Sequence, residues 1–107
     1  MALNRDVAFT WLGHSTFLVE TPGGKTILID PFLEGNPKCP PDRKVISKCD
    51  LILVTHAHID HMADVIPTAG RTGAAVVAIV ELADWFQRKG VQNVTGMNKG
   101  GTFRFGD

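Results

Sequence analysis

Residues 51–61 read LILVTHAHIDH: four apolar residues, a threonine, and then three histidines and an aspartate within six positions. A continuous apolar run of this kind is typical of a strand that is buried on both faces. The end of a buried strand is fixed in its sheet, so the loop that leaves it can turn several imidazoles toward one point. Imidazole nitrogens and carboxylate oxygens are ligands of zinc and similar divalent ions. The stretch therefore predicts a metal site at a sheet edge.

The spacing within this stretch predicts two pairs of ligands. Alternate residues of an extended loop share one side, so we expect His56 and His58 to converge on one ion. We expect Asp60 and His61, beyond the bend, to face a second ion. The alternatives are solvated loop histidines, or a helix N-terminus with Asp60 as its cap. The pattern HxHxDH after a buried strand favours the metal site.

The rest of the chain predicts a small α/β or α+β fold, a mixed sheet with covering helices. We expect strands over 7–12, 16–20, 26–29, 51–54, 75–80, 93–95 and 102–105, and helices over 62–69 and 81–89. Four prolines in residues 31–44 predict a long loop. Pro67 is expected to disturb the first helix, and Gly70 and Gly73 to end it.

Composition excludes several classes of protein. The 107 residues include 11 Lys or Arg and 11 Asp or Glu, and 44% are hydrophobic, as in an ordinary single globular domain. The basic residues are scattered, which argues against a nucleic-acid partner. The longest apolar run, residues 74–80, is too short to span a membrane. No signal-peptide core follows residues 1–6, so we expect a cytoplasmic protein. Cys39 and Cys49 have neither zinc-site nor redox spacing and are expected to be reduced and structural.

The stretch 55–61 resembles the HxHxDH signature of the metallo-β-lactamase superfamily. Three further stretches, FTWLGHS at 9–15, ILIDP at 27–31 and NKGGT at 98–102, resemble a branch of uncharacterised metal-dependent hydrolases related to sugar-phosphate lactonases. The resemblance covers residues 7–107. It implies an αββα sandwich with metals at one edge between two sheets, of which this chain, as a single domain over 1–107, is the N-terminal half.

The resemblance also implies the metal ligands. By position, His56 and His58 bind a first metal, and Asp60 and His61 bind a second. Asp60 is the expected catalytic residue, because it anchors the second metal and helps to orient the nucleophile. The implied cofactor is a divalent metal, two zinc ions in the first instance, with manganese, iron or nickel as alternatives.

Three further residues are expected around these ligands. Asp30 matches the family's aspartate at the end of an early strand, which accepts hydrogen bonds from the histidine loop; its alternative is an ordinary Asp-Pro turn. His14 is expected at the pocket edge as a hydrogen-bonding group, not as a ligand, or else as a plain turn histidine. Asp64 could neutralise a metal-bound histidine, but an acid at a helix start is more often solvated.

The resemblance implies more ligands than this chain contains. Family members add a third histidine, a bridging aspartate and a last histidine, but no histidine follows His61 here. We expect a missing C-terminal half or a partner chain to complete the site, with a symmetric homodimer as an alternative, and near-background activity from this chain alone.

For the intact protein we expect a metal-dependent hydrolase. Metal-activated hydroxide would hydrolyse an ester, lactone or phosphodiester bond of a small-molecule substrate. The alternative is a non-catalytic metal-binding or oligomerising module on the same scaffold. A nuclease of the same superfamily is disfavoured because the sequence shows no basic patch.

Overall fold

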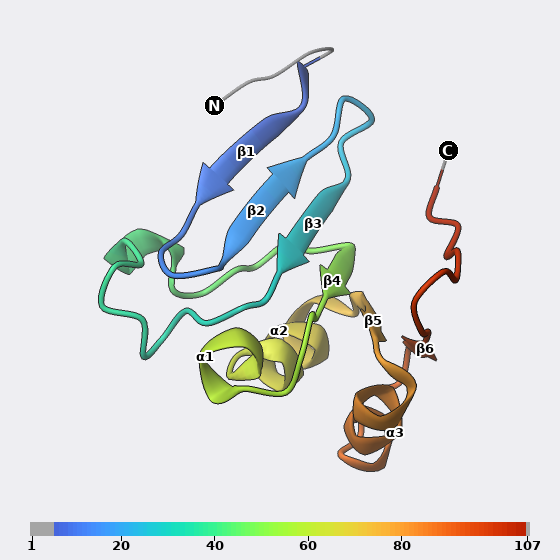
Figure 1. Ribbon diagram of the computed structural model, residues 1–107. Coiled ribbons are helices and arrows are strands. Elements are labelled where there is room, and N and C mark those ends of the chain that lie inside the picture. Colours follow the sequence, from blue (N-terminus) through green and yellow to red (C-terminus); the bar gives the residue numbers. More distant parts are fainter. Residues whose placement is uncertain (1–5, 107) are drawn as a thin grey trace.

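The computed structural model describes residues 6–106 and contains a six-stranded mixed sheet (Figure 1). The strands are β1 (Ala8–Trp11), β2 (Phe17–Glu20), β3 (Thr26–Ile29), β4 (Leu51–Leu53), β5 (Ala75–Ala78) and β6 (Val94–Gly96), in this order across the sheet. The helices are the 3-10 helix η2 (Pro41–Arg43) and the α-helices α1 (Ile59–Met62), α2 (Val65–Thr72) and α3 (Val80–Arg88). The predicted mixed α/β fold is confirmed.

The sheet changes from antiparallel to parallel pairing at β3. Strands β1, β2 and β3 form an antiparallel meander, and β3, β4, β5 and β6 are parallel neighbours. The turn between β2 and β3 is closed by hydrogen bonds from the Lys25 N–H to the Thr21 Oγ1 and from the Gly24 N–H to the Thr21 carbonyl. Gly24 has a φ of 83°, which glycine adopts without steric cost. Because β3 and β4 are parallel, their carboxyl ends meet at the same edge of the sheet.

One face of the sheet carries the core. Leu18, Leu28, Ile52 and Val76 are neighbours in register across β2 to β5, and each is at most 4% exposed. They pack in one cluster with buried residues of the helices, among them Val65, Ala69, Leu82 and Phe86. The i, i+3, i+4 spacing of Leu82, Trp85 and Phe86 indicates one apolar side of α3; Leu82 and Phe86 are buried there and Trp85 is partly buried.

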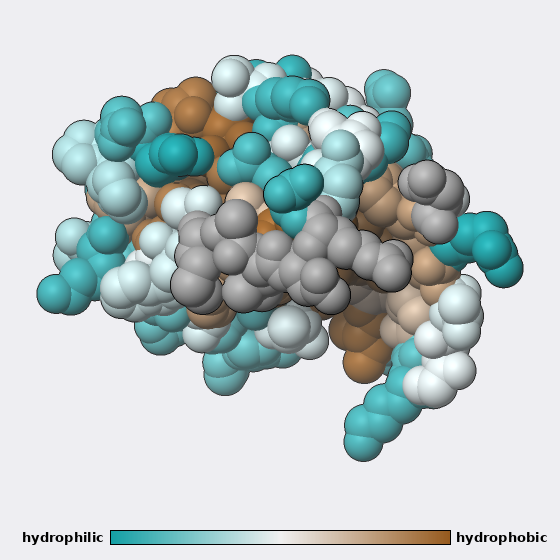
Figure 2. All heavy atoms as spheres, turned by 90° about the horizontal axis from the view of Figure 1, so that it is seen from above, coloured by the Kyte–Doolittle hydropathy of each residue, from teal (hydrophilic) through white to brown (hydrophobic). Residues whose placement is uncertain are grey.

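The opposite face is apolar as well, and we call it the open face. Its central row in register consists of Trp11, Phe17, Ile29, Leu53 and Val77. None of the five belongs to the core cluster that contains the helices. Trp11 is 58% exposed and Phe17 is 36% exposed. Seen from above, hydrophobic residues are visible in a hollow of the surface (Figure 2). A sheet with two apolar faces is typical of a layer that is covered on both sides.

Three expectations about local structure are wrong. Of the strand expected over 75–80 only Ala75–Ala78 forms, and Val80 already begins α3. The strand expected over 102–105 does not form, although the turn before it does, with the Gly101 N–H donating to the Asn98 carbonyl. The chain leaves the edge strand β6 and runs back toward the β2–β3 end of the sheet (Figure 1). There the Phe105 ring lies 6.0 Å from the Lys25 ammonium. A segment in which apolar and polar residues alternate forms a strand only where a neighbouring strand offers backbone N–H and C=O groups to pair with it.

The helix expected over 62–69 is two helices, α1 and α2, and it continues past Gly70 to Thr72. Pro67 is the third residue of α2, where a missing N–H costs no hydrogen bond, so it does not disturb the helix. Gly73, with a φ of 74°, ends it as expected. Among residues 6–106 the structure holds no helix with the length and hydrophobicity of a membrane span.

Both cysteines are free and buried, as expected for structural thiols. Burial raises the pKa of the Cys49 thiol from 9.0 to about 11. The unfolded chain therefore ionises this thiol first as the pH rises, and we expect the free energy of unfolding to fall between about pH 9 and pH 11. Urea denaturation at a series of pH values, under reducing conditions, measures how the free energy of unfolding depends on pH. This dependence should be weaker in a Cys49→Ala variant, and an equal dependence in that variant would contradict the prediction.

Candidate metal centre

Strand β4 delivers the histidine loop to the edge of the sheet. The Val54 N–H still donates to the Val77 carbonyl, and the loop then runs in extended conformation to His58, which precedes the first turn of α1. His56 and His58 thus lie on the loop, while Asp60 and His61 lie within α1. No side chain caps this helix, so Asp60 is not the N-cap that the alternative interpretation required.

The four histidines of the chain gather around this loop. The ring centroid of His56 lies 4.7 Å from that of His58 and 4.0 Å from that of His61. His14, from the turn between β1 and β2, has its ring centroid 5.1 Å from that of His61. Solvated loop histidines would not pack their rings in this way. The arrangement is a continuous cluster at one edge of the sheet.

Asp30 lies beneath this cluster at the end of β3. Its side chain is 3% exposed, and its Oδ2 lies 2.9 Å from the Nδ1 of His61. The Thr55 N–H donates to Oδ1 at 2.7 Å and the Thr55 hydroxyl donates to Oδ2 at 2.6 Å. Since an ionised carboxylate only accepts hydrogen bonds, this contact requires the His61 proton on Nδ1, and the neutral tautomer with that proton presents the Nε2 lone pair to a metal. The geometry matches the supporting contact expected of Asp30.

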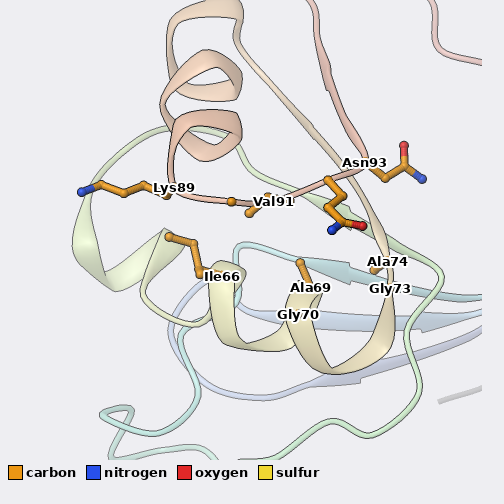
Figure 3. Close-up of a pocket in the computed structure, with 10 residues that line it drawn as sticks. Ile66, Ala69, Gly70, Gly73, Ala74, Lys89, Val91 and Asn93 are labelled. Carbon is orange, nitrogen blue, oxygen red and sulfur yellow. The ribbon is translucent and has the colours of Figure 1, made fainter.

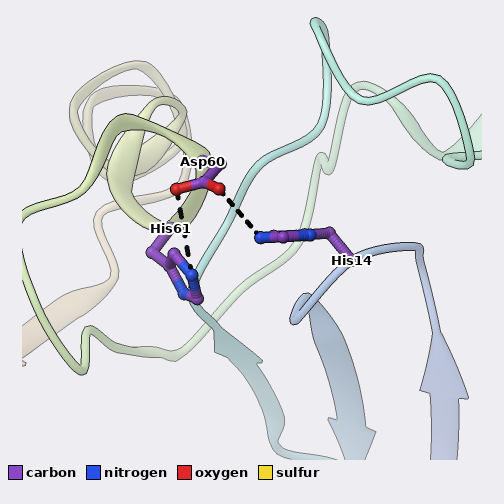
Figure 4. Close-up of side chains that lie close together, drawn as sticks. All are labelled: His14, Asp60 and His61. Carbon is purple, nitrogen blue, oxygen red and sulfur yellow. Dashed lines mark ion pairs between the residues drawn. The ribbon is translucent and has the colours of Figure 1, made fainter.

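Asp60 lies between His14 and His61 (Figure 4). Its Oδ2 is 2.9 Å from His14 Nε2, and its Oδ1 is 3.8 Å from His61 Nε2. Ligand atoms of these three residues all lie within 4.8 Å of one another. In a tetrahedral metal site the ligand atoms lie about 3.3 Å apart, because each is about 2 Å from the ion, so these three side chains need only a small movement to enclose one.

The pairing of the predicted ligands differs in part from the expected one. Asp60 and His61 lie together, but His56 packs against both His58 and His61. His56 and His61 also form a second group of close ligand atoms, with Asp30 as its third member. Both oxygens of Asp30 already accept hydrogen bonds, so this group offers two ligands and a supporting acceptor. Among the described residues, no group of three close ligand atoms includes His58.

The expectation that Asp64 is a solvated acid is wrong. Its Oδ2 accepts hydrogen bonds from the Leu33 N–H at 2.6 Å and the Glu34 N–H at 3.4 Å, and its own N–H donates to the Pro31 carbonyl. Asp64 therefore fastens the junction of α1 and α2 to the loop that follows Asp30. A helix-start acid normally turns to its own helix, and the sequence gives no signal for this long-range contact.

Sequence reasoning also missed Thr16. Its buried hydroxyl donates to the Asp30 carbonyl at 2.7 Å and accepts from the Phe32 N–H at 3.1 Å. The two bonds hold the backbone on both sides of Pro31. Asp30 has a φ of 48°, which is unusual for a residue with a Cβ, so this brace helps to aim its carboxylate.

The turn that carries His14 depends on Gly13. Gly13 has a φ of 101°, and a Cβ added there would lie 2.7 Å from the Lys38 Cβ and 2.9 Å from the Asn36 side chain. We expect Gly13→Ala to lower the free energy of unfolding by about 3 kcal/mol, since left-handed strain and overpacking add. Gly24→Ala is the matched control, with positive φ but open space around it, and should cost about 1 kcal/mol. If urea denaturation shows equal losses of unfolding free energy in Gly13→Ala and Gly24→Ala, the close packing around Gly13 does not matter.

Two cavities formed by the described residues lie beside the histidine loop, and another lies far from it. One, of about 410 Å³, is lined mainly by apolar side chains, including Met62, Leu82 and Trp85. The other, of about 390 Å³, lies on the open face against Leu53 and Val77 and reaches Thr55. The third cavity, of about 320 Å³, lies between the end of α2 and the loop after α3, at the opposite edge of the sheet (Figure 3). Its lining is mostly apolar and small, without a ligand cluster.

A model of the β-lactamase superfamily domain matches residues 8–107, and the chain belongs to this family. The superfamily expected from the sequence motifs is thereby confirmed.

Relatives of this chain carry the description UPF0173 metal-dependent hydrolase. One from Koribacter versatilis is 52% identical over 98 residues, which cover 92% of this chain and 42% of the relative. Another from Rubrobacter xylanophilus is 54% identical over 97 residues, which cover 91% of this chain and 40% of the relative. This chain therefore spans about two fifths of the length of these relatives.

Solved structures share the fold. Igni18, described as a novel metallo hydrolase from the archaeon Ignicoccus hospitalis, has a TM-score of 0.75 and 34% identity, over 92% of this chain and 42% of its own. A mutant of the CmlA beta-hydroxylase, at 21% identity and a TM-score of 0.73, covers 97% of this chain and 23% of its own and shows the likeness of fold alone.

Proposed function

We propose that this chain is the metal-binding part of a metal-dependent hydrolase. The observation that carries the proposal is the cluster of imidazoles and one carboxylate at the end of β4, with His61 fixed by the buried Asp30. The descriptions of the relatives as metal-dependent hydrolases and of Igni18 as a metallo hydrolase support it.

The donor set fits a divalent transition metal. Nitrogen donors from His56, His58 and His61 and an oxygen donor from Asp60 suit zinc, and also manganese, iron or nickel. We propose two zinc ions, the first held by His56 and His58 and the second by Asp60 and His61. Within residues 6–106 no group of three close ligand atoms includes His58, so we propose that further polypeptide supplies the remaining donors to the first ion.

The reaction we propose is hydrolysis of an ester, lactone or phosphodiester bond of a small molecule. When bound, a divalent metal supplies an activated hydroxide at neutral pH and offsets negative charge that develops on the substrate. Within this chain, Asp60 would hold the second metal and orient the nucleophile. Asp30 keeps His61 in one tautomer and one orientation through its hydrogen bond to Nδ1. The two cavities beside the loop offer room for the body of a substrate.

We further propose that additional polypeptide, from the same protein or a partner chain, covers the open face and completes the site. An exposed Trp11 beside Phe17 supports this, because an apolar sheet face of this kind is stabilised by a second layer. A cytoplasmic location belongs to the same proposal and is supported by the two buried free thiols.

A chimera tests the proposed function. This chain replaces the matching region of the Koribacter versatilis relative, to which it is 52% identical over 98 residues. We expect zinc- or manganese-dependent hydrolysis of a p-nitrophenyl ester, a lactone or bis(p-nitrophenyl) phosphate, and its loss in the same chimera with His61→Ala.

The intact relative is the positive control. If it hydrolyses one of these substrates while a folded, zinc-binding chimera hydrolyses none, the chain is a non-catalytic metal-binding or oligomerising module. An unchanged rate in the His61→Ala chimera would also contradict the proposal.

A further inference from the structure

We propose that His14 is a ligand of the second metal, so that His14, Asp60 and His61 together hold one divalent ion. This inference rests on the proposed function for the presence of a metal. It changes the expected role of His14, which sequence reasoning placed at the pocket edge as a hydrogen-bonding group.

The number and position of the donor atoms favour a ligand role for His14. With Asp60 and His61 alone, the second ion would have two protein ligands from this chain, whereas catalytic zinc usually holds three. His14 Nε2 lies 2.9 Å from Asp60 Oδ2, and one ligand atom of each of the three residues lies within 4.8 Å of the other two. His14 therefore supplies a third donor within this chain, besides any that further polypeptide adds, and it comes from a separate segment, the turn between β1 and β2.

The backbone conformation of the turn at His14 also favours this role. His14 has a φ of 53°, a conformation that is unfavourable for a residue with a Cβ and that often marks functional sites. Two contacts keep it there: the Thr16 N–H donates to the Gly13 carbonyl, and the Trp11 indole N–H donates to the His14 carbonyl at 2.9 Å. The turn aims the imidazole away from its own strands and toward α1 (Figure 4).

The charges of the site also suit a divalent ion. Asp60 would contact the ion directly, and Asp30 would act on it through the His61 ring. Two carboxylates balance the two charges of a divalent ion, while the imidazoles bind as neutral ligands. In the metal-free chain the His14 Nε2 lies within hydrogen-bond distance of Asp60 Oδ2. A neutral His14 would bind the ion through Nε2 with its single ring proton on Nδ1.

The simpler role for His14 is to donate a hydrogen bond to Asp60 and so to position it. The two roles differ at one atom. A ligand binds the metal through Nε2 and loses the proton there, while a positioning residue keeps that proton when the metal binds. The test must therefore observe the nitrogen itself and not the activity alone.

The test is ¹⁵N NMR of the histidine rings in the 107-residue chain, with zinc added to two equivalents. We expect the Nε2 resonances of both His14 and His61 to move from their metal-free positions to those of metal-bound nitrogen. His14→Asn is the matched variant, because asparagine tolerates positive φ but has no imidazole. We expect it to weaken zinc binding at the second site by at least about 100-fold, beyond the 10-fold to 100-fold typical of a supporting residue.

The outcomes separate the two proposals. A His61 Nε2 that moves while His14 Nε2 stays protonated overturns the ligand role of His14 and leaves the proposed function standing. An unchanged zinc affinity in the folded His14→Asn variant does the same. If no histidine nitrogen of the wild-type chain responds to zinc or manganese, both this inference and the proposed function fail.

Discussion

Replacing His61 with alanine is expected to remove tight metal binding, raising the dissociation constant for zinc at the second site by at least about 100-fold. His61 is the most central side chain of the cluster. It contacts the rings of His14 and His56 and bonds to Asp30 through Nδ1, which leaves Nε2 for the ion. Its loss removes a donor to the metal and leaves the buried Asp30 carboxylate with only its two hydrogen bonds from Thr55. Isothermal titration with zinc measures the change.

The control for His61→Ala is Lys99→Ala. Lys99 is exposed and lines the cavity on the open face, but it offers no ligand at the cluster. We expect the control to bind zinc like the wild type. Circular dichroism and the urea midpoint show whether the His61 variant stays folded. Zinc affinity within about 10-fold of the wild type in a folded His61→Ala variant would place the metal elsewhere.

The second large effect is expected at Asp30. Asp30→Ala leaves three donors in and around a buried position without their acceptor: the Thr55 N–H, the Thr55 hydroxyl and the His61 ring. We expect the free energy of unfolding to fall by about 3 kcal/mol. Zinc binding should also weaken by about 10-fold to 100-fold, because the His61 ring loses its fixed orientation.

Asp30→Asn separates these two effects. Asparagine tolerates a φ of 48° and keeps one acceptor oxygen, so part of the stability should return. Its amide cannot accept at both former oxygens and carries no charge, so zinc affinity should stay low. Stability and zinc affinity that recover together would contradict the separation and would indicate that Asp30 acts only on the fold.

The sequence predicted the elements whose signal is local. The apolar run 51–54 and the pattern of Leu82 and Phe86 mark a strand and a helix on their own, and the structure contains both. The strand expected over 102–105 failed because pairing depends on a neighbouring backbone, which alternation within a segment does not show. Pro67 was misjudged because its effect depends on its place in the helix, and the start of α2 was not visible from composition.

Only the part of the candidate site that lies within the HxHxDH motif could be predicted from the sequence. His56, Asp60 and His61 belong to this part, because all three follow the end of one strand. The contacts of Thr16 and Asp64 join segments 14 to 31 residues apart. No periodicity or spacing encodes such contacts, since they arise only once the meander and the helices are packed. The approach of His14 to Asp60 is of the same kind, and it changes the ligand count at the second metal.

The central claim is that a divalent ion binds between the side chains that β4 delivers to the sheet edge. Anomalous diffraction at the zinc absorption edge, from crystals of this chain grown with zinc, tests it most directly. The account predicts an anomalous peak in contact with Asp60 and His61, with His14 as the third ligand. Zinc found only at sites remote from these side chains, or a cluster that stays without an anomalous peak at saturating zinc, would contradict it.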